Sequence, residues 1–383
     1  MHLVRYAPFA LPAQRIWLLA AAIRYFCSAL VNYDNCFYAI WKIKANILLR
    51  SKEHLRLKNP LISNVYGTKA VATDLLESSK VQAIIGPQKS EHTEFIADLG
   101  YKVHIPIISF SATIPSIYSR SPYFVRTAPD EQSQVKAIAS ITQAFKWKDS
   151  DYGNRLVPDL INAFQDINTR IIYRSFISPF ATEDQIVEEL QKLMIMQTSV
   201  FIVHMSAPFG VKFFLKAKDL GMMNEGYVWI LTSGLMNVLD VLEPTVLDSM
   251  QGALGVVPYI ATSEKLDNFN TRWKRESFIG KEMINFGLWA YDTIWALAMA
   301  AERVGDMKPN SLRLESDGNF IDVLGVSQKG PKLLEEILKI KFEGLSGEFH
   351  VVNGQLQPSA FRILNVVGKG GRDVGFWTSK HGI

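Results

Sequence analysis

The side chains best suited to holding a small polar molecule are hydroxyls that follow short apolar segments of the chain. Ser111 and Thr113 lie where the apolar residues 103–110 give way to a turn, and Ser90 begins a segment with the composition of a helix. Free amide N–H groups at the start of a helix, together with a hydroxyl, can bind a carboxylate. Serine and threonine also cap helices throughout proteins, and on its own the pattern favours capping.

No set of residues has the spacing of a catalytic or metal-binding centre. The sequence contains none of the motifs G-x-x-x-x-G-K-S/T, H-E-x-x-H, C-x-x-C or G-x-S-x-G, which mark phosphate, zinc, dithiol and serine-hydrolase chemistry. The seven histidines are scattered, and His204, at the end of an apolar segment, is more simply a core histidine than a ligand contact. We therefore expect no enzymatic activity, no catalytic residue, no metal site and no cofactor.

Length, composition and charge describe an ordinary globular protein. The chain has 383 residues, of which 48% are apolar and 20% charged. At about 100–200 residues per domain, this length indicates two compact units. The formal net charge of +4 is too small over this length to favour nucleic acid as a partner. Cys27 and Cys36 are too few for a disulfide framework or a four-thiolate metal site.

The longest apolar stretch, residues 284–301, is expected to be a buried helix rather than a membrane span. Its length approaches that of a span, but Asn285 and Asp292 lie within it, and an acid inside a membrane is costly. A helix that is apolar on most sides also occurs in the core of a large domain. We expect no transmembrane segment in this chain.

Alternating segments from about residue 67 predict an α/β fold. Apolar residues at helical spacing predict helices over residues 69–78, 90–99, 182–194, 209–220, 263–278 and 333–342. Short apolar runs predict strands over residues 81–85, 103–110, 199–205, 227–231 and 255–260. Strands that are apolar on both faces form parallel sheets covered by helices, and their repetition in two blocks predicts two doubly wound lobes. Ligand contacts are then expected beyond the carboxyl ends of strands, at residues 86–90, 109–113, 204–208 and 232–234.

Longer blocks of sequence resemble one known family. They run in order from about residue 67 to residue 378 and include Val81-Gln-Ala-Ile-Ile-Gly-Pro-Gln88, Ile105-Pro-Ile-Ile-Ser-Phe-Ser-Ala-Thr113, Phe286-Gly-Leu-Trp-Ala-Tyr-Asp292 and Gly344-Leu-Ser-Gly347. In these blocks the chain resembles the amino-terminal, receptor ligand-binding domain of plant glutamate-receptor-like ligand-gated ion channels. That domain is similar to the type I periplasmic binding proteins, in which two α/β lobes with three crossovers close on a small ligand at a hinge cleft.

The resemblance implies a division of the chain between the two lobes. It places lobe 1 at residues 67–128 and 259–343, and lobe 2 at residues 129–258 and 344–383. Residues 1–66 do not match the pattern and are expected to be partly disordered or non-native.

The resemblance also implies which residues contact a ligand. In relatives that bind amino acids, the serine of G-P-x-x-S and the threonine of S-A-T hold the ligand carboxylate and amino group. In this chain these are Ser90 and Thr113, beside Ser111 and a backbone amide offered by Ala112. The tyrosine of D-Y-G, which covers the ligand, is Tyr152. The acid that usually holds the ligand ammonium after W-I-x-T is replaced here by Ser233, and a hydroxyl cannot provide that charge-assisted bond.

Two features differ from the family. Where the family has an apolar strand, only Lys148-Asp149-Ser150 separate Trp147 from Asp151, so we expect lobe 2 to lack about one strand and Tyr152 to be displaced. The sequence also stops soon after Gly375-Phe-Trp-Thr378, so the glutamate-binding core and the pore segments of the family are expected to be absent.

The sequence thus predicts the extracellular ligand-binding or regulatory region of a glutamate-receptor-like channel. Its ligand would be an amino acid or a similar small molecule, and its membrane location would come only through a full-length receptor. Two alternatives stay open: a module that assembles as a homo- or hetero-dimer through lobe 1 with a degenerate cleft, and a truncated gene product.

Overall fold

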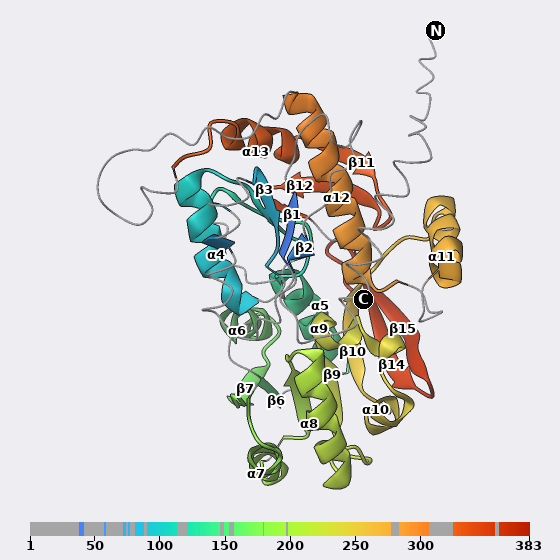
Figure 1. Ribbon diagram of the computed structural model, residues 1–383. Helices are drawn as coiled ribbons and strands as arrows, with labels where there is room; N and C mark the ends of the chain where they lie inside the picture. The colour runs from blue at the N-terminus through green and yellow to red at the C-terminus, as the bar shows by residue number, and fades with distance from the viewer. Residues whose placement is uncertain are drawn as a thin grey trace.

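The computed structural model describes residues 38–41, 57–58, 72–73, 76, 81–87, 90–112, 121–129, 131–145, 149–152, 157–178, 180–196, 198–276, 283–305, 325–356 and 360–383. These residues form two lobes, each built around one β-sheet with helices on its faces (Figure 1). The α/β class predicted from the sequence is confirmed.

The sheet of the first lobe has the strand order β11-β12-β13-β5-β4-β3-β1-β2. Its strands are β1 (Tyr38–Trp41), β2 (Leu57–Lys58), β3 (Ala83–Ile85), β4 (Ile107–Ser109), β5 (Phe124–Arg126), β11 (Lys341–Glu343), β12 (Glu348–Val352) and β13 (Gln355–Leu356). The central strands β3, β4 and β5 run parallel, and all their residues are buried, so both faces must be covered. The helix α4 (Ser90–Val103) covers one face, and α11 (Glu264–Glu276), α12 (Asn285–Val304) and α13 (Gly330–Leu338) cover the other.

The sheet of the second lobe has the order β15-β14-β10-β9-β8-β6-β7. Its strands are β6 (Asp149–Tyr152), β7 (Arg170–Tyr173), β8 (Val200–Val203), β9 (Val228–Leu231), β10 (Leu254–Pro258), β14 (Ala360–Val367) and β15 (Gly370–Thr378). Because side chains alternate along a strand, β8 supplies both faces. Val200 and Ile202 pack toward α5 (Glu131–Ala144) and α6 (Val157–Gln165), whereas Phe201 and Val203 pack toward α7 (Glu183–Met194), α8 (Ala207–Asp219) and α10 (Pro244–Ser249).

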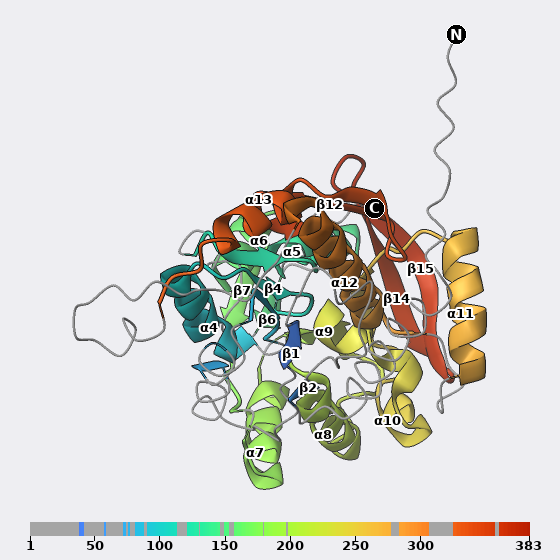
Figure 2. The same ribbon diagram turned by 45° about the horizontal axis from the view of Figure 1, so that its top comes forward.

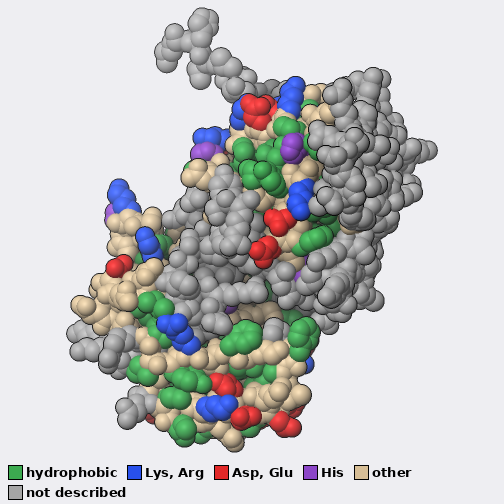
Figure 3. All heavy atoms as spheres, turned by 90° about the vertical axis from the view of Figure 1, so that its left-hand side faces the viewer, with side chains coloured by type: hydrophobic (Ala, Val, Ile, Leu, Met, Phe, Trp, Pro, Cys, Tyr) green, Lys and Arg blue, Asp and Glu red, His purple; other side chains and the backbone are tan. Residues whose placement is uncertain are grey.

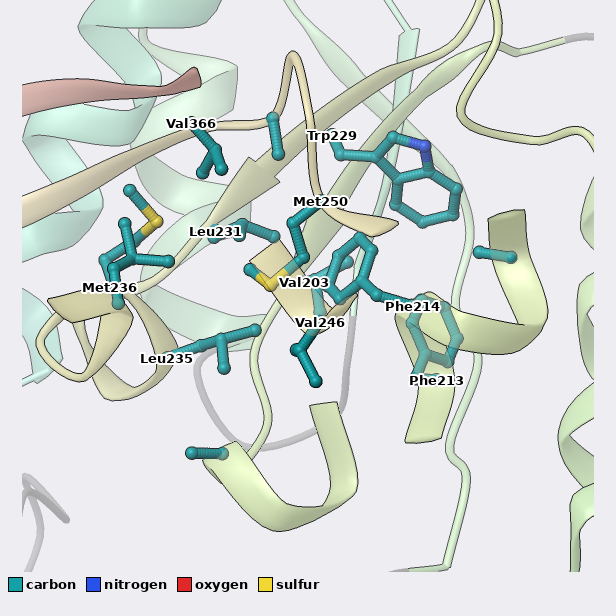
Figure 4. Close-up of a cluster of buried hydrophobic side chains, with 14 of the residues drawn as sticks. Val203, Phe213, Phe214, Trp229, Leu231, Leu235, Met236, Val246, Met250 and Val366 are labelled. Carbon is teal, nitrogen blue, oxygen red and sulfur yellow. The ribbon is translucent and has the colours of Figure 1, made fainter. Parts of the chain in front are cut away.

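The core beneath α8 is built around Trp229 of β9. Its ring lies 4.6 Å from the ring of Phe201, and edge-to-face contacts join it to Phe213 and Phe214 (Figure 4). The indole Nε1 donates a hydrogen bond to the carbonyl oxygen of Met222 at 2.7 Å. A buried tryptophan needs such a partner for its N–H, and this bond fixes the turn that leads into β9.

The apolar stretch at residues 284–301 forms the buried helix α12, as predicted. Asp292 in its middle is fully buried, and its carboxylate accepts hydrogen bonds from the N–H groups of Leu345 and Ser346, both at 2.8 Å, and from the Ser346 hydroxyl at 2.5 Å. Burial raises the pKa of this carboxyl above its usual value, and the hydrogen bonds oppose that rise. A Cβ on Gly344 would lie 2.3 Å from the Asp292 carboxylate, so only glycine fits beside the acid. Among the described residues, no helix has the length and apolar character needed to cross a membrane.

The chain crosses between the two lobes at three places. The first crossing lies between β5 and α5, the second between β10 and α11, and the third between β13 and β14. The division predicted at residue 344 is wrong for β12 and β13, which join the sheet of lobe 1. The turn at Gly344–Gly347, held by Asp292, precedes β12, and the pairing of β12 with β11 and of β13 with β5 places both strands in that sheet.

The prediction that lobe 2 lacks one strand is wrong. Residues Asp149–Tyr152 form β6, which pairs in parallel with β7 on one side and with β8 on the other. Backbone groups make this pairing, so a short polar segment can occupy the place where an apolar strand was expected. Residues 1–66 also contribute more than expected, because β1 pairs antiparallel with β3 and β2 pairs with β1.

Charged side chains on the face shown in Figure 3 are mixed in sign. Acidic and basic side chains are interspersed there with apolar ones instead of forming a patch of one charge. This distribution fits the small net charge of the sequence.

Candidate functional site

The turn after β4 is organised by Ser109, which the structure buries completely. Its hydroxyl donates to the carbonyl oxygen of Pro87, after β3, at 2.8 Å and accepts the N–H of Ala112 at 2.9 Å. Ser109 therefore joins the carboxyl ends of two neighbouring strands. The Ala112 amide, expected to be offered to a ligand, is bonded within this turn. The sequence showed Ser109 as a polar residue at the end of a predicted strand. Its role in the turn depends on its contact with Pro87, 22 positions earlier in the chain.

The other predicted residues of lobe 1 lie at the same edge of the sheet or outside the described part. Ser90 is the first residue of α4, which follows β3, and Ser111 is partly exposed in the turn after β4. Since both strands are parallel neighbours, the structure brings these two positions to one edge. Thr113 lies outside the described residues.

In lobe 2 the strand ends of β8 and β9 bring three polar side chains together. Val203 and Leu231 are register partners, so His204 and Thr232 follow them side by side. Nδ1 of His204 and Oγ1 of Thr232 are 3.1 Å apart, within hydrogen-bond distance. Ser233 begins the short helix α9 (Ser233–Met236) and is partly exposed. His204, expected to be a core histidine, is partly exposed and contacts Thr232, the residue before the predicted Ser233.

Ser233 is held in place by a buried amide side chain. Its backbone N–H donates to Oε1 of Gln134, from α5, at 2.8 Å, and Gln134 is buried. On the other side of α9, Met236 packs against β10 so closely that a Cβ on Gly255 would lie 2.4 Å from its Cγ. These contacts fix the backbone of α9, while within the described chain the Ser233 hydroxyl has no hydrogen-bond partner.

Tyr152 lies at this same edge of the second sheet. It is the last residue of β6 and is the register partner of Ile202 in β8, two residues before His204. The strand that was expected to be missing therefore carries Tyr152 to the end of the sheet where Ser233 lies.

The helix α12 connects the polar turns of the two lobes. The hydroxyl of Thr127, which donates to the carbonyl oxygen of Ser109 at 3.3 Å, lies 2.5 Å from the hydroxyl of Thr293 on α12. Eight residues earlier on the same helix, Nδ2 of Asn285 donates to Oδ1 of Asn237, which follows α9, at 3.0 Å. Eight residues of helix rise about 12 Å.

The course of α12 explains how one helix reaches both turns. It runs from the first lobe to the strands of the second, and its amino-terminal end lies near α9 and β10 (Figures 1 and 2). The turn after β4 and the helix after β9 are thus attached to one rigid element, at points about 12 Å apart along its axis.

The described side chains at these strand ends are polar. Hydroxyls, an amide and an imidazole are present, and no group of three or more His, Cys, Asp or Glu side chains in the described chain could hold a metal ion. Such groups can orient a small polar molecule by hydrogen bonds.

Solved structures with low sequence identity to this chain identify its fold. A leucine-binding protein from Thermotoga maritima matches 83% of this chain and 86% of its own with a TM-score of 0.67 and 18% identity. A solute-binding protein from Rhodopseudomonas palustris, solved with 3,4-dihydroxybenzoic acid, matches 96% of this chain and 94% of its own with a TM-score of 0.69 and 18% identity. The fold is therefore that of a two-lobed, type I periplasmic binding protein.

The family follows from closer relatives. Residues 48–369 match the receptor family ligand binding region, and the chain belongs to that family. It is 44% identical over 331 residues to glutamate receptor 2.2 of Arabidopsis thaliana, and this match covers 84% of the chain and 36% of the receptor. It is 40% identical over 378 residues to glutamate receptor 2.6 of the same plant, and this match covers 94% of the chain and 38% of the receptor. The chain thus spans little more than a third of the length of these curated relatives. Because the family match begins at residue 48, the expectation that residues 1–66 are unmatched is wrong for residues 48–66.

Proposed function

We propose that this chain is the extracellular ligand-binding region of a glutamate-receptor-like ligand-gated ion channel. Its two lobes would close on an amino acid or a similar small molecule, and in a full-length receptor this motion would bias a pore that lies outside the present sequence. The observation that supports the proposal most is the attachment of the polar turns of both lobes to α12, through Thr293 and Asn285.

Structural neighbours support a small carboxylate as ligand. The structure of a Desulfitobacterium hafniense substrate-binding protein contains Leu, and those of two Rhodopseudomonas palustris proteins contain benzoate and 4-hydroxybenzoate. Each of these ligands carries a carboxylate. Free N–H donors of the kind that begin α4 bind such a group.

Five residues are proposed to contact the ligand. Ser90, Ser111 and Thr113 would hold it from lobe 1, and Tyr152 and Ser233 from lobe 2. The backbone amide of Ala112 is assigned to the turn instead, because Ser109 already accepts its hydrogen bond.

Thermal unfolding of the purified chain tests this proposal. L-leucine, L-glutamate and benzoate are added at millimolar concentration, and at least one should raise the melting temperature, because a ligand present at 100 times its Kd stabilises the folded state by about 2.7 kcal/mol. Ser111→Ala should reduce the rise, and the exposed Ser379→Ala serves as the matched control. No rise with any of the three compounds would contradict the proposal.

The alternative function is an assembly module that dimerises through lobe 1. The engagement of the Ala112 amide within its own turn favours this reading, because it removes one expected ligand donor. Sedimentation at high concentration separates the two proposals: a dimer without any ligand-induced stabilisation supports the module, and a strict monomer contradicts it.

A further inference from the structure

The start of α12 contacts both lobes. Along this helix Leu288 and Ile294 pack into the core of lobe 1, as does Met283 just before it. Ile284, the residue next to Met283, packs instead against the core of lobe 2. Two neighbouring residues thus place their side chains against different lobes. The start of α12 is therefore a non-covalent connection between the lobes, in addition to the three crossings of the chain.

Asn285 adds two hydrogen bonds to this connection. Its side-chain Nδ2 donates to Oδ1 of Asn237 at 3.0 Å and to the carbonyl oxygen of Pro258 at 3.3 Å. Asn237 directly follows α9, and Pro258 is the last residue of β10, from which the second crossing leaves lobe 2. The Asn285 side chain is half-buried, so these bonds are stronger than they would be in water.

A chain of hydrogen bonds leads from Asn285 to Ser233. The backbone N–H of Asn237, whose side chain accepts from Asn285, donates to the carbonyl oxygen of Ser233 at 3.0 Å. The N–H of Ser233 donates to Oε1 of Gln134 at 2.8 Å. The peptide groups on both sides of Ser233 are therefore held, one by α5 of lobe 2 and the other, through Asn237, by α12 of lobe 1.

We propose that Asn285 is a positioning residue for ligand binding, which holds Ser233 at a fixed place relative to lobe 1. This inference rests on the function proposed above, in which Ser233 contacts the ligand. Ile284 keeps the start of α12 against lobe 2, and Asn285 sets the place of α9. A ligand held by the turns of lobe 1 then meets Ser233 without a rearrangement of α9, which lowers the entropic cost of binding.

A double-variant binding measurement tests this role. Calorimetry on the purified 383-residue chain uses the compound among L-leucine, L-glutamate and benzoate that raises the melting temperature most. Asn285→Leu should raise the Kd about tenfold, the scale of one lost hydrogen bond, and the exposed Asn268→Leu is the matched control that should leave it unchanged. In a Ser233→Ala background, Asn285→Leu should raise the Kd by less than about twofold, because the hydroxyl that it positions is gone. An equal rise in both backgrounds, or no rise in either, would overturn the positioning role.

Two variants of the partner residue test the hydrogen bond itself. Asn237→Asp keeps an acceptor for Nδ2 of Asn285 and should retain the wild-type Kd. Asn237→Leu removes the acceptor and should raise the Kd as much as Asn285→Leu does. Equal Kd values for the two Asn237 variants would show that this side-chain bond does not position Ser233.

Amide hydrogen exchange without ligand separates this inference from the proposed function. Asn285→Leu should speed exchange in residues 231–238, which include α9, and unchanged exchange in α7 shows that the variant is folded. Unchanged exchange in residues 231–238 would overturn the attachment of α9 to α12. Failure of the wild type to bind any of the three compounds would overturn the proposed function, and with it the role of Asn285 in binding, while the exchange result still decides whether α12 holds α9.

Discussion

The replacement of Asp292 by asparagine tests how α12 is anchored in lobe 1. The two carboxylate oxygens of Asp292 accept three hydrogen bonds from the turn at Gly344–Gly347, and they are fully buried. Asparagine has the same shape but one acceptor oxygen, so its NH2 group would face an N–H donor. A buried amide left without its acceptor costs about 1–3 kcal/mol, and the lost hydroxyl bond adds to this.

Removal of the buried charge offsets part of that loss. We therefore expect Asp292→Asn to lower the free energy of unfolding by about 1–3 kcal/mol at neutral pH. This is a large fraction of the roughly 5–15 kcal/mol that stabilises a typical domain. Urea titration followed by tryptophan fluorescence measures it, with the exposed Asp166→Asn as the matched control, which should change stability by no more than about 0.5 kcal/mol.

The pH dependence gives a second measurement of the same contact. Burial raises the folded-state pKa of Asp292, so between its unfolded value and the raised value the folded protein binds the proton more tightly. The wild-type protein therefore gains stability relative to Asp292→Asn as the pH falls through the raised pKa, and the difference levels off below the unfolded value. An Asn variant as stable as the wild type at neutral pH, or a difference that shrinks as the pH falls, would refute this reasoning.

Two further substitutions test local contacts. Gly344→Ala places a methyl group 2.3 Å from the Asp292 carboxylate and should destabilise lobe 1 by about 1–3 kcal/mol. Gly375→Ala is the control and should be tolerated, because the nearest atom to the new methyl group would be 3.7 Å away. Equal urea midpoints for the two variants would show that the turn at Gly344 accommodates the methyl group without loss of stability. Gln134→Leu removes the acceptor of the Ser233 N–H and should weaken ligand binding about tenfold. Gln134→Glu keeps an acceptor oxygen and should bind the ligand as the wild type does. If calorimetry gives the two variants the same Kd, Gln134 does not position Ser233 for ligand binding.

Local patterns made much of the fold predictable. The apolar run around Val200–Val203 predicted a strand buried on both faces, and the structure packs helices on each side of it. The stretch at residues 284–301 predicted a buried helix, and Asp292 within it pointed to a protein core because a membrane would exclude it.

Contacts between distant residues explain what could not be predicted. The strand β6 is polar, and only its pairing with β7 and β8 reveals it. The strands β12 and β13 join lobe 1 because β13 pairs with β5, more than 200 residues earlier in the chain, and Asp292 holds the turn that precedes them. At the proposed site, the hydroxyls predicted from the sequence lie at the carboxyl ends of the parallel strands, as that pattern implies. The pairing of His204 with Thr232, and the engagement of the Ala112 amide by Ser109, appear only in three dimensions.

Small-angle scattering during a ligand titration tests the central claim most directly, because lobe closure on a small molecule must make the protein more compact. The radius of gyration of the purified chain should fall saturably as the compound among L-leucine, L-glutamate and benzoate that raises the melting temperature most is added. A radius of gyration that stays constant while calorimetry shows a saturated site would contradict closure. A constant radius with no binding at all would contradict the ligand-binding function.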